Sequence, residues 1–189
     1  WIELAFLTGT ITGPVKTQLE PNTPEFERFI RAWGTIAYHE MLLLGALIAM
    51  IIVSWGATNQ FGTWTFALLF AARVSAKLNL YLGVQKINLE FIPEQLNHLP
   101  SHFRIARMNW LFPISVSGLT FAMGLWIGQA WMAETAANAV GFALLSALAA
   151  LALLEHWFMV LPLPDEKLWR WLLPDRSSAP QATRLSEDA

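Results

Sequence analysis

Residues 41–53, MLLLGALIAMIIV, decide the fold, because they form an unbroken run of uncharged, almost wholly apolar side chains. With its flanks the run extends over 33–55, which is about the twenty residues that an α-helix needs to cross a bilayer. Trp33 and Trp55 stand at its two ends, where indole rings suit the headgroup region of a membrane. The segment is therefore predicted to be a transmembrane helix.

Three stretches of similar length follow at 63–83, 110–131 and 138–162. An apolar stretch at 1–13 comes first, but thirteen helical residues span only roughly 20 Å, less than the hydrocarbon core of about 30 Å. We expect it to be the end of a membrane helix whose beginning precedes Trp1. The predicted fold is all-α: a polytopic transmembrane helix bundle with one partial and four full spans, and short cytoplasmic surface helices.

The composition supports a membrane protein. Of 189 residues, 55% are hydrophobic and 14% are charged, against about 25% charged in a typical soluble domain. Helices this apolar around their circumference would need a larger soluble protein to bury them. The net charge of −2 gives no reason to expect nucleic acid as a partner. Cysteine is absent, which excludes disulfides and thiolate metal ligands.

The basic residues predict the orientation. Lysine and arginine occur in 14–32, 84–109 and 163–189, whereas the connections at 56–62 and 132–137 contain neither. Basic loops stay in the cytoplasm, so 14–32, 84–109 and the C-terminus are expected there. The lipid bilayer is thus the first predicted partner.

The segments between the spans are expected to lie at the membrane surface. Residues 84–109 are predicted to form one or two short helices, with Pro93 and Pro100 as boundaries. A helix is expected over 23–31, capped by Thr23. Residues 168–173, LWRWLL, suit an interfacial anchor. Residues 1–173 are predicted to form a single integral membrane domain, and 174–189 a disordered tail.

Ionisable and amide side chains inside the spans are the candidate functional residues, because each costs free energy in lipid. Measured along each helix from its cytoplasmic end, the ionisable ones fall roughly 9–15 Å deep. We expect one buried polar layer in which two cations face three carboxylates across the bundle. Its predicted members are Glu3, His39, Glu40, Arg73, Lys77, Asn79, Glu155 and His156.

Three roles are open for this layer. It could be an ion-pair lock that fixes the order of the helices. It could hold a metal or a tetrapyrrole, because His39 and His156 suit a magnesium or iron centre with carboxylates beside them, although no Glu-x-x-His pair occurs. It could also be a proton or ion pathway. No phosphate loop, zinc spacing or nucleophile elbow accompanies it.

Several stretches resemble a known family. They are WIELAFLTGTITGP at 1–14, HE at 39–40, WGATNQFGTWTFALLF at 55–70, SAKLNLYLGV at 75–84, EFIPEQLNHLPSHF at 90–103, MNWLFPISVS at 108–117 and LLEHWFMVLPLPDEKLWRW at 153–171. Together they are similar to the photosynthetic complex assembly protein 2 family, the PuhE-type protein of anoxygenic phototrophic bacteria. The likeness covers nearly all of 1–172.

The resemblance implies a multi-pass protein of the bacterial inner (intracytoplasmic) membrane. It implies an assembly factor for the reaction centre–light-harvesting core that modulates bacteriochlorophyll supply, with core complex subunits and pigment-biosynthesis proteins as partners. No catalytic residues carry over. His39 and His156 are the expected ligands if bacteriochlorophyll or a precursor is bound. The alternative is a metal-dependent membrane enzyme of bacteriochlorophyll biosynthesis that uses the Glu/His layer.

Overall fold

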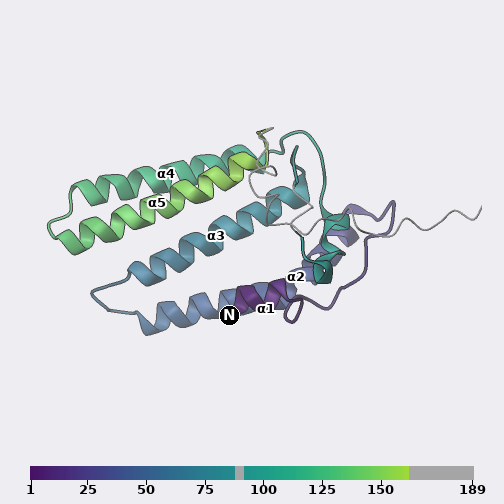
Figure 1. The fold of residues 1–189 in the computed structure, drawn as a ribbon, viewed down its shortest axis with the longest axis horizontal. Helices are drawn as coiled ribbons and strands as arrows, with labels where there is room; N and C mark the ends of the chain where they lie inside the picture. Colours follow the sequence, from purple (N-terminus) through teal and green to yellow (C-terminus); the bar gives the residue numbers. More distant parts are fainter. Residues whose placement is uncertain (88–91, 162–189) are drawn as a thin grey trace, which may run out of the picture.

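The computed structural model describes residues 1–87 and 92–161, and every regular element within them is helical. The elements are α1 (Ile2–Leu7), α2 (Glu25–Val53), α3 (Phe61–Leu82), the 3-10 turns η2 (Glu94–Leu96) and η3 (Leu99–His102), α4 (Leu111–Trp131) and α5 (Ala136–Phe158). The predicted all-α fold is thereby confirmed. Figure 1 shows α2, α3, α4 and α5 as four long rods that alternate in direction.

Three of these helices, α2, α4 and α5, are long and apolar enough to cross a membrane. Fewer than a quarter of the residues in their most apolar windows are buried, 17%, 11% and 22% respectively, so their outer faces suit lipid rather than water. α3 has 22 residues but is not among the three, and it carries Arg73, Lys77 and Asn79. Figure 1 shows it alongside the others.

The connections that contain Lys and Arg and those that contain neither lie at opposite ends of the bundle (Figure 1). The links between α2 and α3 and between α4 and α5 lie at one end, and the segments before α2 and between α3 and α4 lie at the other (Figure 1). This is the arrangement that the charge pattern requires of an alternating bundle.

The hydrophobic core lies between α3, α4 and α5. Leu68 and Ala72 of α3 and Leu119 of α4 pack there against Ala149 and Ala152 of α5. The alanines of α5 allow close helix approach, as small residues do in membrane bundles. α2 packs against α3 on its other side (Figure 1).

The helical part of the N-terminal stretch is shorter than expected. α1 ends at Leu7, and Gly9 adopts a left-handed conformation with φ +72°, which a side chain rarely tolerates. The chain then lies against α2, where a β-carbon on Gly13 would fall 2.0 Å from the carbonyl oxygen of Gly34. His39 also donates its backbone N–H to the carbonyl of Thr12. Residues 1–13 are therefore a short helix and a loop folded onto α2.

The boundaries differ in detail. The helix predicted over 23–31 and the next span are one helix, α2, and Pro24 rather than Thr23 stands at its start. The Thr23 hydroxyl instead donates to the Glu20 carbonyl. Two short 3-10 turns do form between α3 and α4, with Pro93 before the first, while Pro100 lies inside the second. The anchor at 168–173, the tail at 174–189 and the last residue of the span at 138–162 lie outside the described residues.

Candidate functional site: a divided polar layer beside an aromatic cavity

The polar residues of α3 occupy two opposite faces. Arg73 and Lys77 are four residues apart and share one face, and so do Ser75 and Asn79. The two pairs are offset by two residues, which is about 200° around a helix with 3.6 residues per turn. The cations therefore face α1 and α2, while the neutral pair faces α4 and α5.

Ion pairs join α3 to the N-terminal half of the chain. Arg73 forms an ion pair with Glu3 of α1, and Lys77 forms one with Glu40 of α2. The Glu40 side chain is 5% exposed and that of Lys77 is 24% exposed. Lys77 also lies 5.4 Å from the centre of the Phe6 ring. Both cations that would be costly in lipid are thus neutralised on one side of α3.

His39 is completely buried beside these pairs. Its ring packs 4.4 Å from that of Phe6, and its Nε2 lies 3.7 Å from a carboxylate oxygen of Glu3 and 4.0 Å from one of Glu40. Neither ring nitrogen makes a hydrogen bond within the described residues. Buried polar atoms usually have a partner, so these two nitrogens are the most unusual polar groups of the site.

The neutral side of α3 is a hydrogen-bonded network. His156 is completely buried, with its Nε2 2.9 Å from the Ser75 hydroxyl and its Nδ1 2.8 Å from the Ala152 carbonyl. Ser75 donates to Ser115 of α4, which also accepts from the Asn79 amide at 3.0 Å. α3, α4 and α5 are therefore tied together without charge.

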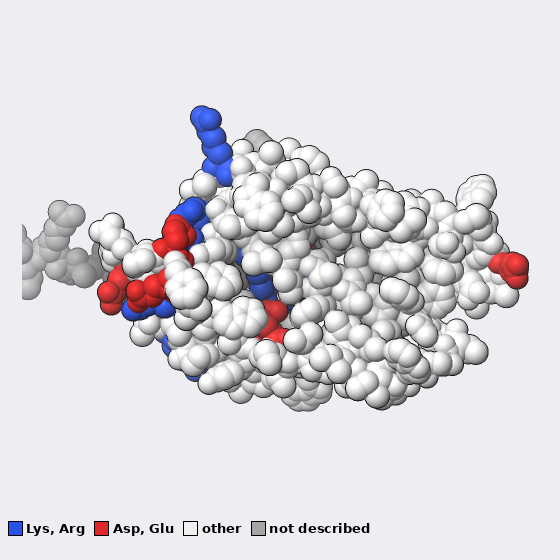
Figure 2. Space-filling view, turned by 180° about the vertical axis from the view of Figure 1, so that it is seen from behind, with Lys and Arg blue, Asp and Glu red and all other residues white. Residues whose placement is uncertain are grey.

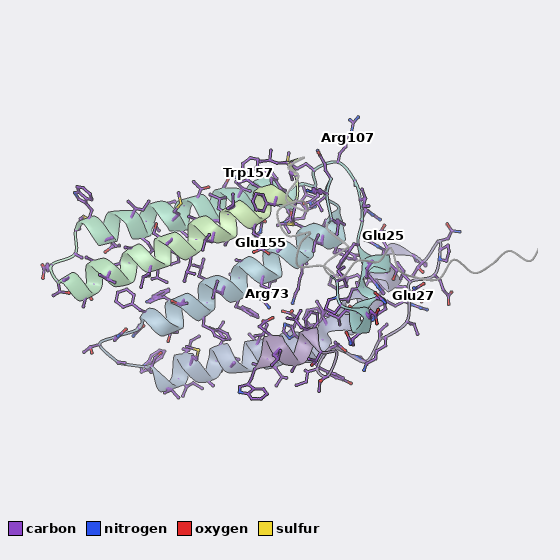
Figure 3. The ribbon with its side chains drawn as sticks, viewed as in Figure 1. Glu25, Glu27, Arg73, Arg107, Glu155 and Trp157 are labelled. Atoms are coloured by element: carbon purple, nitrogen blue, oxygen red, sulfur yellow. The ribbon has the colours of Figure 1, made fainter. Side chains whose placement is uncertain are left out.

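Glu155 does not join either cluster. It is exposed on α5 and forms no ion pair within 4 Å in the described part of the chain, although its charge acts on Arg73 of the neighbouring helix α3 (Figure 3). Adjacent helical residues point about 100° apart, so with His156 turned inward Glu155 faces outward. The expected single layer is instead two clusters separated by α3, with Glu155 outside both.

Ser75 and Ser115 were not predicted as site residues, because single hydroxyls in a span are common. The spacing of four between Ser75 and Asn79 was the available signal, since it marks a second polar face on α3. α4 contributes no charge, but it supplies Ser115 and Leu119 to the interior.

Arg28 connects three segments at the basic end of the bundle. Its guanidinium is buried, lies 4.1 Å from the centre of the Tyr81 ring, and donates to the carbonyls of Tyr81 and His102 at 2.7 and 3.1 Å. It also pairs with Glu25, which forms a second ion pair with Arg104. α2, the end of α3 and the connection before α4 are thereby held in one arrangement.

Two histidines lie buried in that connection, outside the membrane-spanning helices. Burial lowers the pKa of His98, and the nearby positive groups His102 and Lys16 lower it further. Burial also lowers the pKa of His102, against a hydrogen bond from its Nδ1 to the backbone carbonyl of His98, which favours the charged form. Both rings are therefore held neutral at neutral pH.

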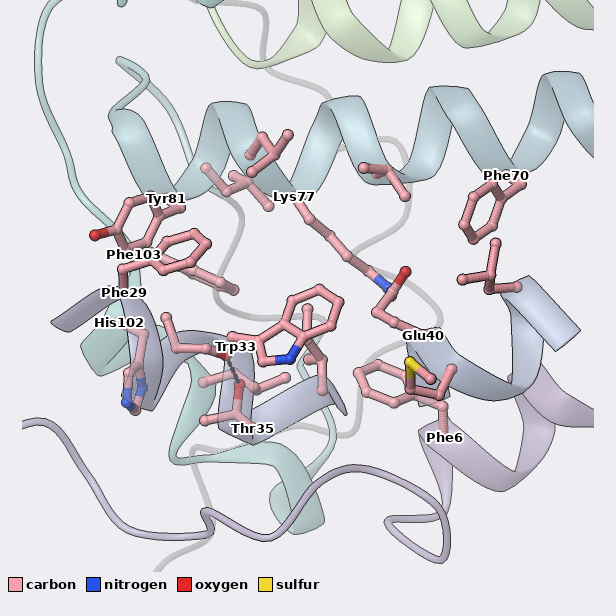
Figure 4. A pocket seen from close by; sticks show the side chains of 18 residues that line it. Phe6, Phe29, Trp33, Thr35, Glu40, Phe70, Lys77, Tyr81, His102 and Phe103 are labelled. Carbon is pink, nitrogen blue, oxygen red and sulfur yellow. Dashed lines mark hydrogen bonds and ion pairs between the residues drawn. The ribbon is translucent and has the colours of Figure 1, made fainter. Parts of the chain in front are cut away.

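A cavity of about 510 Å³ lies between α2 and α3 on the ion-pair side. Figure 4 shows Lys77 and Glu40 meeting at its wall, with Phe6, Trp33 and Phe70 around them. Figure 2 shows that most charged side chains gather at one end of the molecule, that an acidic side chain lies at the opposite end, and that an acidic and basic pair lies in the middle of the face. The volume falls within the range of about 300–1,000 Å³ typical of small-molecule sites.

The described residues contain no group of three His, Asp or Glu side chains placed to hold a metal ion. The carboxylates of Glu3 and Glu40 are paired with cations, and His156 lies across α3 from His39. The two histidines expected at one centre therefore occupy different sites.

The chain as a whole resembles known proteins in sequence. No solved structure matches the chain. An uncharacterized 30.4 kDa protein in the puhA 5′ region of Rhodobacter capsulatus is 57% identical over 174 residues, which are 92% of this chain and 64% of that protein. The chain thus spans somewhat less than two thirds of the length of this relative. The model of a protein family of unknown function, DUF3623, matches residues 1–180, and the chain belongs to this family.

Proposed function

We propose that the protein is an integral membrane assembly factor for the photosynthetic reaction centre–light-harvesting core. The observation that carries the proposal is the 57% identity to a protein in the puhA 5′ region, a photosynthesis gene region. The helix bundle supports it, because α2, α4 and α5 leave apolar faces available to other membrane helices. The proposed location is the bacterial inner (intracytoplasmic) membrane, with the basic loops 14–32 and 84–109 and the C-terminus in the cytoplasm.

The proposed role includes handling bacteriochlorophyll or a precursor. A magnesium tetrapyrrole offers an axial coordination position that a neutral imidazole can fill. His39 fits this need because neither of its ring nitrogens has a hydrogen bond to the described residues, whereas both nitrogens of His156 are engaged. His39 lies behind Phe6, so ligation would require α1 to move from α2. Pigment-biosynthesis proteins are the proposed partners that would deliver the pigment to this protein.

The alternative proposal is a metal-dependent membrane enzyme of bacteriochlorophyll biosynthesis. It would need Glu40 and Glu155 at one metal centre. Glu40 is bound to Lys77 and Glu155 is exposed on α5, so the arrangement gives this alternative less support than the assembly role.

Deleting the gene in a phototrophic host separates the two proposals. An assembly factor should leave the pigment intermediates unchanged while the core complex falls several-fold, and a tagged copy should crosslink to newly made core subunits. Accumulation of one specific pigment precursor would contradict the assembly role and favour the enzyme. An unchanged core complex and unchanged pigments would contradict both.

Pigment handling has its own test. The tagged protein is purified from the pigment-producing host, and co-purifying tetrapyrrole is measured in wild type, His39→Ala and His156→Ala. The His39 variant should lose most of the pigment while the His156 variant retains it. Wild-type protein without pigment would contradict this part of the proposal and leave the assembly role standing.

A further inference from the structure

The cavity between α2 and α3 opens on the face of the bundle that lipid would cover. Trp33, Met41 and Leu44 line it and are 45%, 59% and 39% exposed, so they form a mouth rather than a closed wall. All three belong to α2, which is long and apolar enough to span the membrane. A ligand would therefore enter from the bilayer and not from water.

Six aromatic rings stand in the wall among aliphatic side chains. They come from α1, α2, α3 and the connection before α4, and they are Phe6, Phe29, Trp33, Phe70, Tyr81 and Phe103. Rings from several directions favour stacked and edge-to-face contacts with another flat ring. A purely aliphatic occupant would gain only burial from the same wall. The lining thus favours a flat, conjugated ligand.

A charged pair, Lys77 and Glu40, lies at the wall of this largely apolar space. Lys77 has three N–H donors, and its described partner is the Glu40 carboxylate. The ammonium is partly exposed and can donate to a further acceptor, such as a carbonyl oxygen. An anionic ligand would compete with Glu40, and a cationic one would be repelled by Lys77, so a neutral acceptor fits the pair best.

We propose that the cavity binds a neutral, membrane-soluble ligand whose flat conjugated ring carries a carbonyl group and an apolar tail. The ring would lie among the aromatic side chains, the carbonyl would accept from Lys77, and the tail would leave between Trp33 and Leu44 into lipid. Isoprenoid quinones and esterified tetrapyrroles share this chemistry. The inference concerns binding at this cavity and does not depend on the assembly role, which the deletion strain tests separately.

The experiment uses the full-length protein in lipid nanodiscs. Three probes are compared by native mass spectrometry: a quinone with a decyl tail, a metal-free tetrapyrrole ester, and a saturated fatty-acid methyl ester without a ring. One or both ring-bearing probes should bind at one per protein, and the methyl ester at least about tenfold more weakly. Quinone binding alone would identify the first source, and tetrapyrrole binding alone the second.

Variants locate the site. Glu40→Gln combined with Lys77→Met removes both charges together, so the fold is not left with an unpaired buried group, and binding should weaken about tenfold. Phe70→Ala should also weaken binding, whereas Phe121→Ala on the exposed face of α4 should not. Equal binding of all three probes, absence of ring binding, or unchanged affinity in the double variant would overturn the proposal.

Discussion

Removal of Lys77 alone should leave the buried carboxylate of Glu40 without its ion-pair partner. The Glu40 side chain is 5% exposed, and breaking a buried ion pair by removing one partner costs about 3–5 kcal/mol. Because a quarter of Lys77 remains accessible, with 24% exposed, we expect Lys77→Met to cost about 3 kcal/mol, at the lower end of that range. Glu40→Gln should cost less, since the partly exposed ammonium can reach other acceptors.

The two changes together should cost less than their sum. Glu40→Gln with Lys77→Met leaves no buried charge, and replacing a buried pair by neutral side chains is often nearly neutral. The coupling free energy should therefore be about 2 kcal/mol, larger than for distant sites. The assay is unfolding in mixed micelles with increasing dodecyl sulfate, followed by helical circular dichroism.

The exposed pair Glu27–Arg31 is the matched control. Its atoms are 2.8 Å apart and its side chains are 49% and 33% exposed. Such a pair one helical turn apart contributes about 0.3–0.5 kcal/mol to stability. Single and double substitutions of Glu27 and Arg31 should therefore show almost no coupling free energy. Additive effects of Glu40→Gln and Lys77→Met would refute the reasoning that α2 and α3 are held by a desolvated ion pair.

The remaining predictions concern three other places. Gly13→Ala should destabilise the N-terminal loop, because its β-carbon would meet the Gly34 carbonyl at 2.0 Å, and protease cleavage near residue 13 should increase. His98 and His102 have lowered pKa values in the folded protein. Their contribution to stability is therefore present above the ordinary value of about 6.5 and is lost as the pH falls through the lowered values. Thermal melts from about pH 7.5 to about pH 5 should show this loss, and substitution of both histidines by Gln should make the melting temperature depend less on pH. Asn79→Ala should cost about 1–3 kcal/mol by removing a buried amide from the α3–α4 network, measured by the same micelle unfolding.

The long helices could be predicted from composition because apolar runs of about twenty residues have few alternatives in a chain of this size. The break after Leu7 could not be predicted as readily. Residues 1–13 are largely apolar, and the left-handed Gly9, the close approach of Gly13 to Gly34 and the bond from the His39 N–H to the Thr12 carbonyl turn them back onto α2. Such contacts depend on where the neighbouring backbone lies.

The candidate site was predicted in its members but not in its arrangement. Glu3, Glu40, Arg73 and Lys77 pair across α1, α2 and α3 as opposite charges inside a bundle were expected to do. The single layer assumed that equal depth brings side chains together. Depth along a helix does not fix direction around it, so His156 faces Ser75 on the far side of α3. The aromatic cavity required the tertiary structure, because its wall comes from four separate segments.

Disulfide crosslinking in native membranes tests most directly whether α3 divides the polar layer. The chain contains no cysteine, so any disulfide formed within it must join the two introduced cysteines. Ser75→Cys with Ser115→Cys should crosslink rapidly, because the two hydroxyl oxygens are 2.8 Å apart and the change is nearly isosteric. Lys77→Cys with Ser115→Cys should stay reduced, since Lys77 faces α2. Efficient crosslinking of the second pair, or none of the first, would contradict the two-sided arrangement.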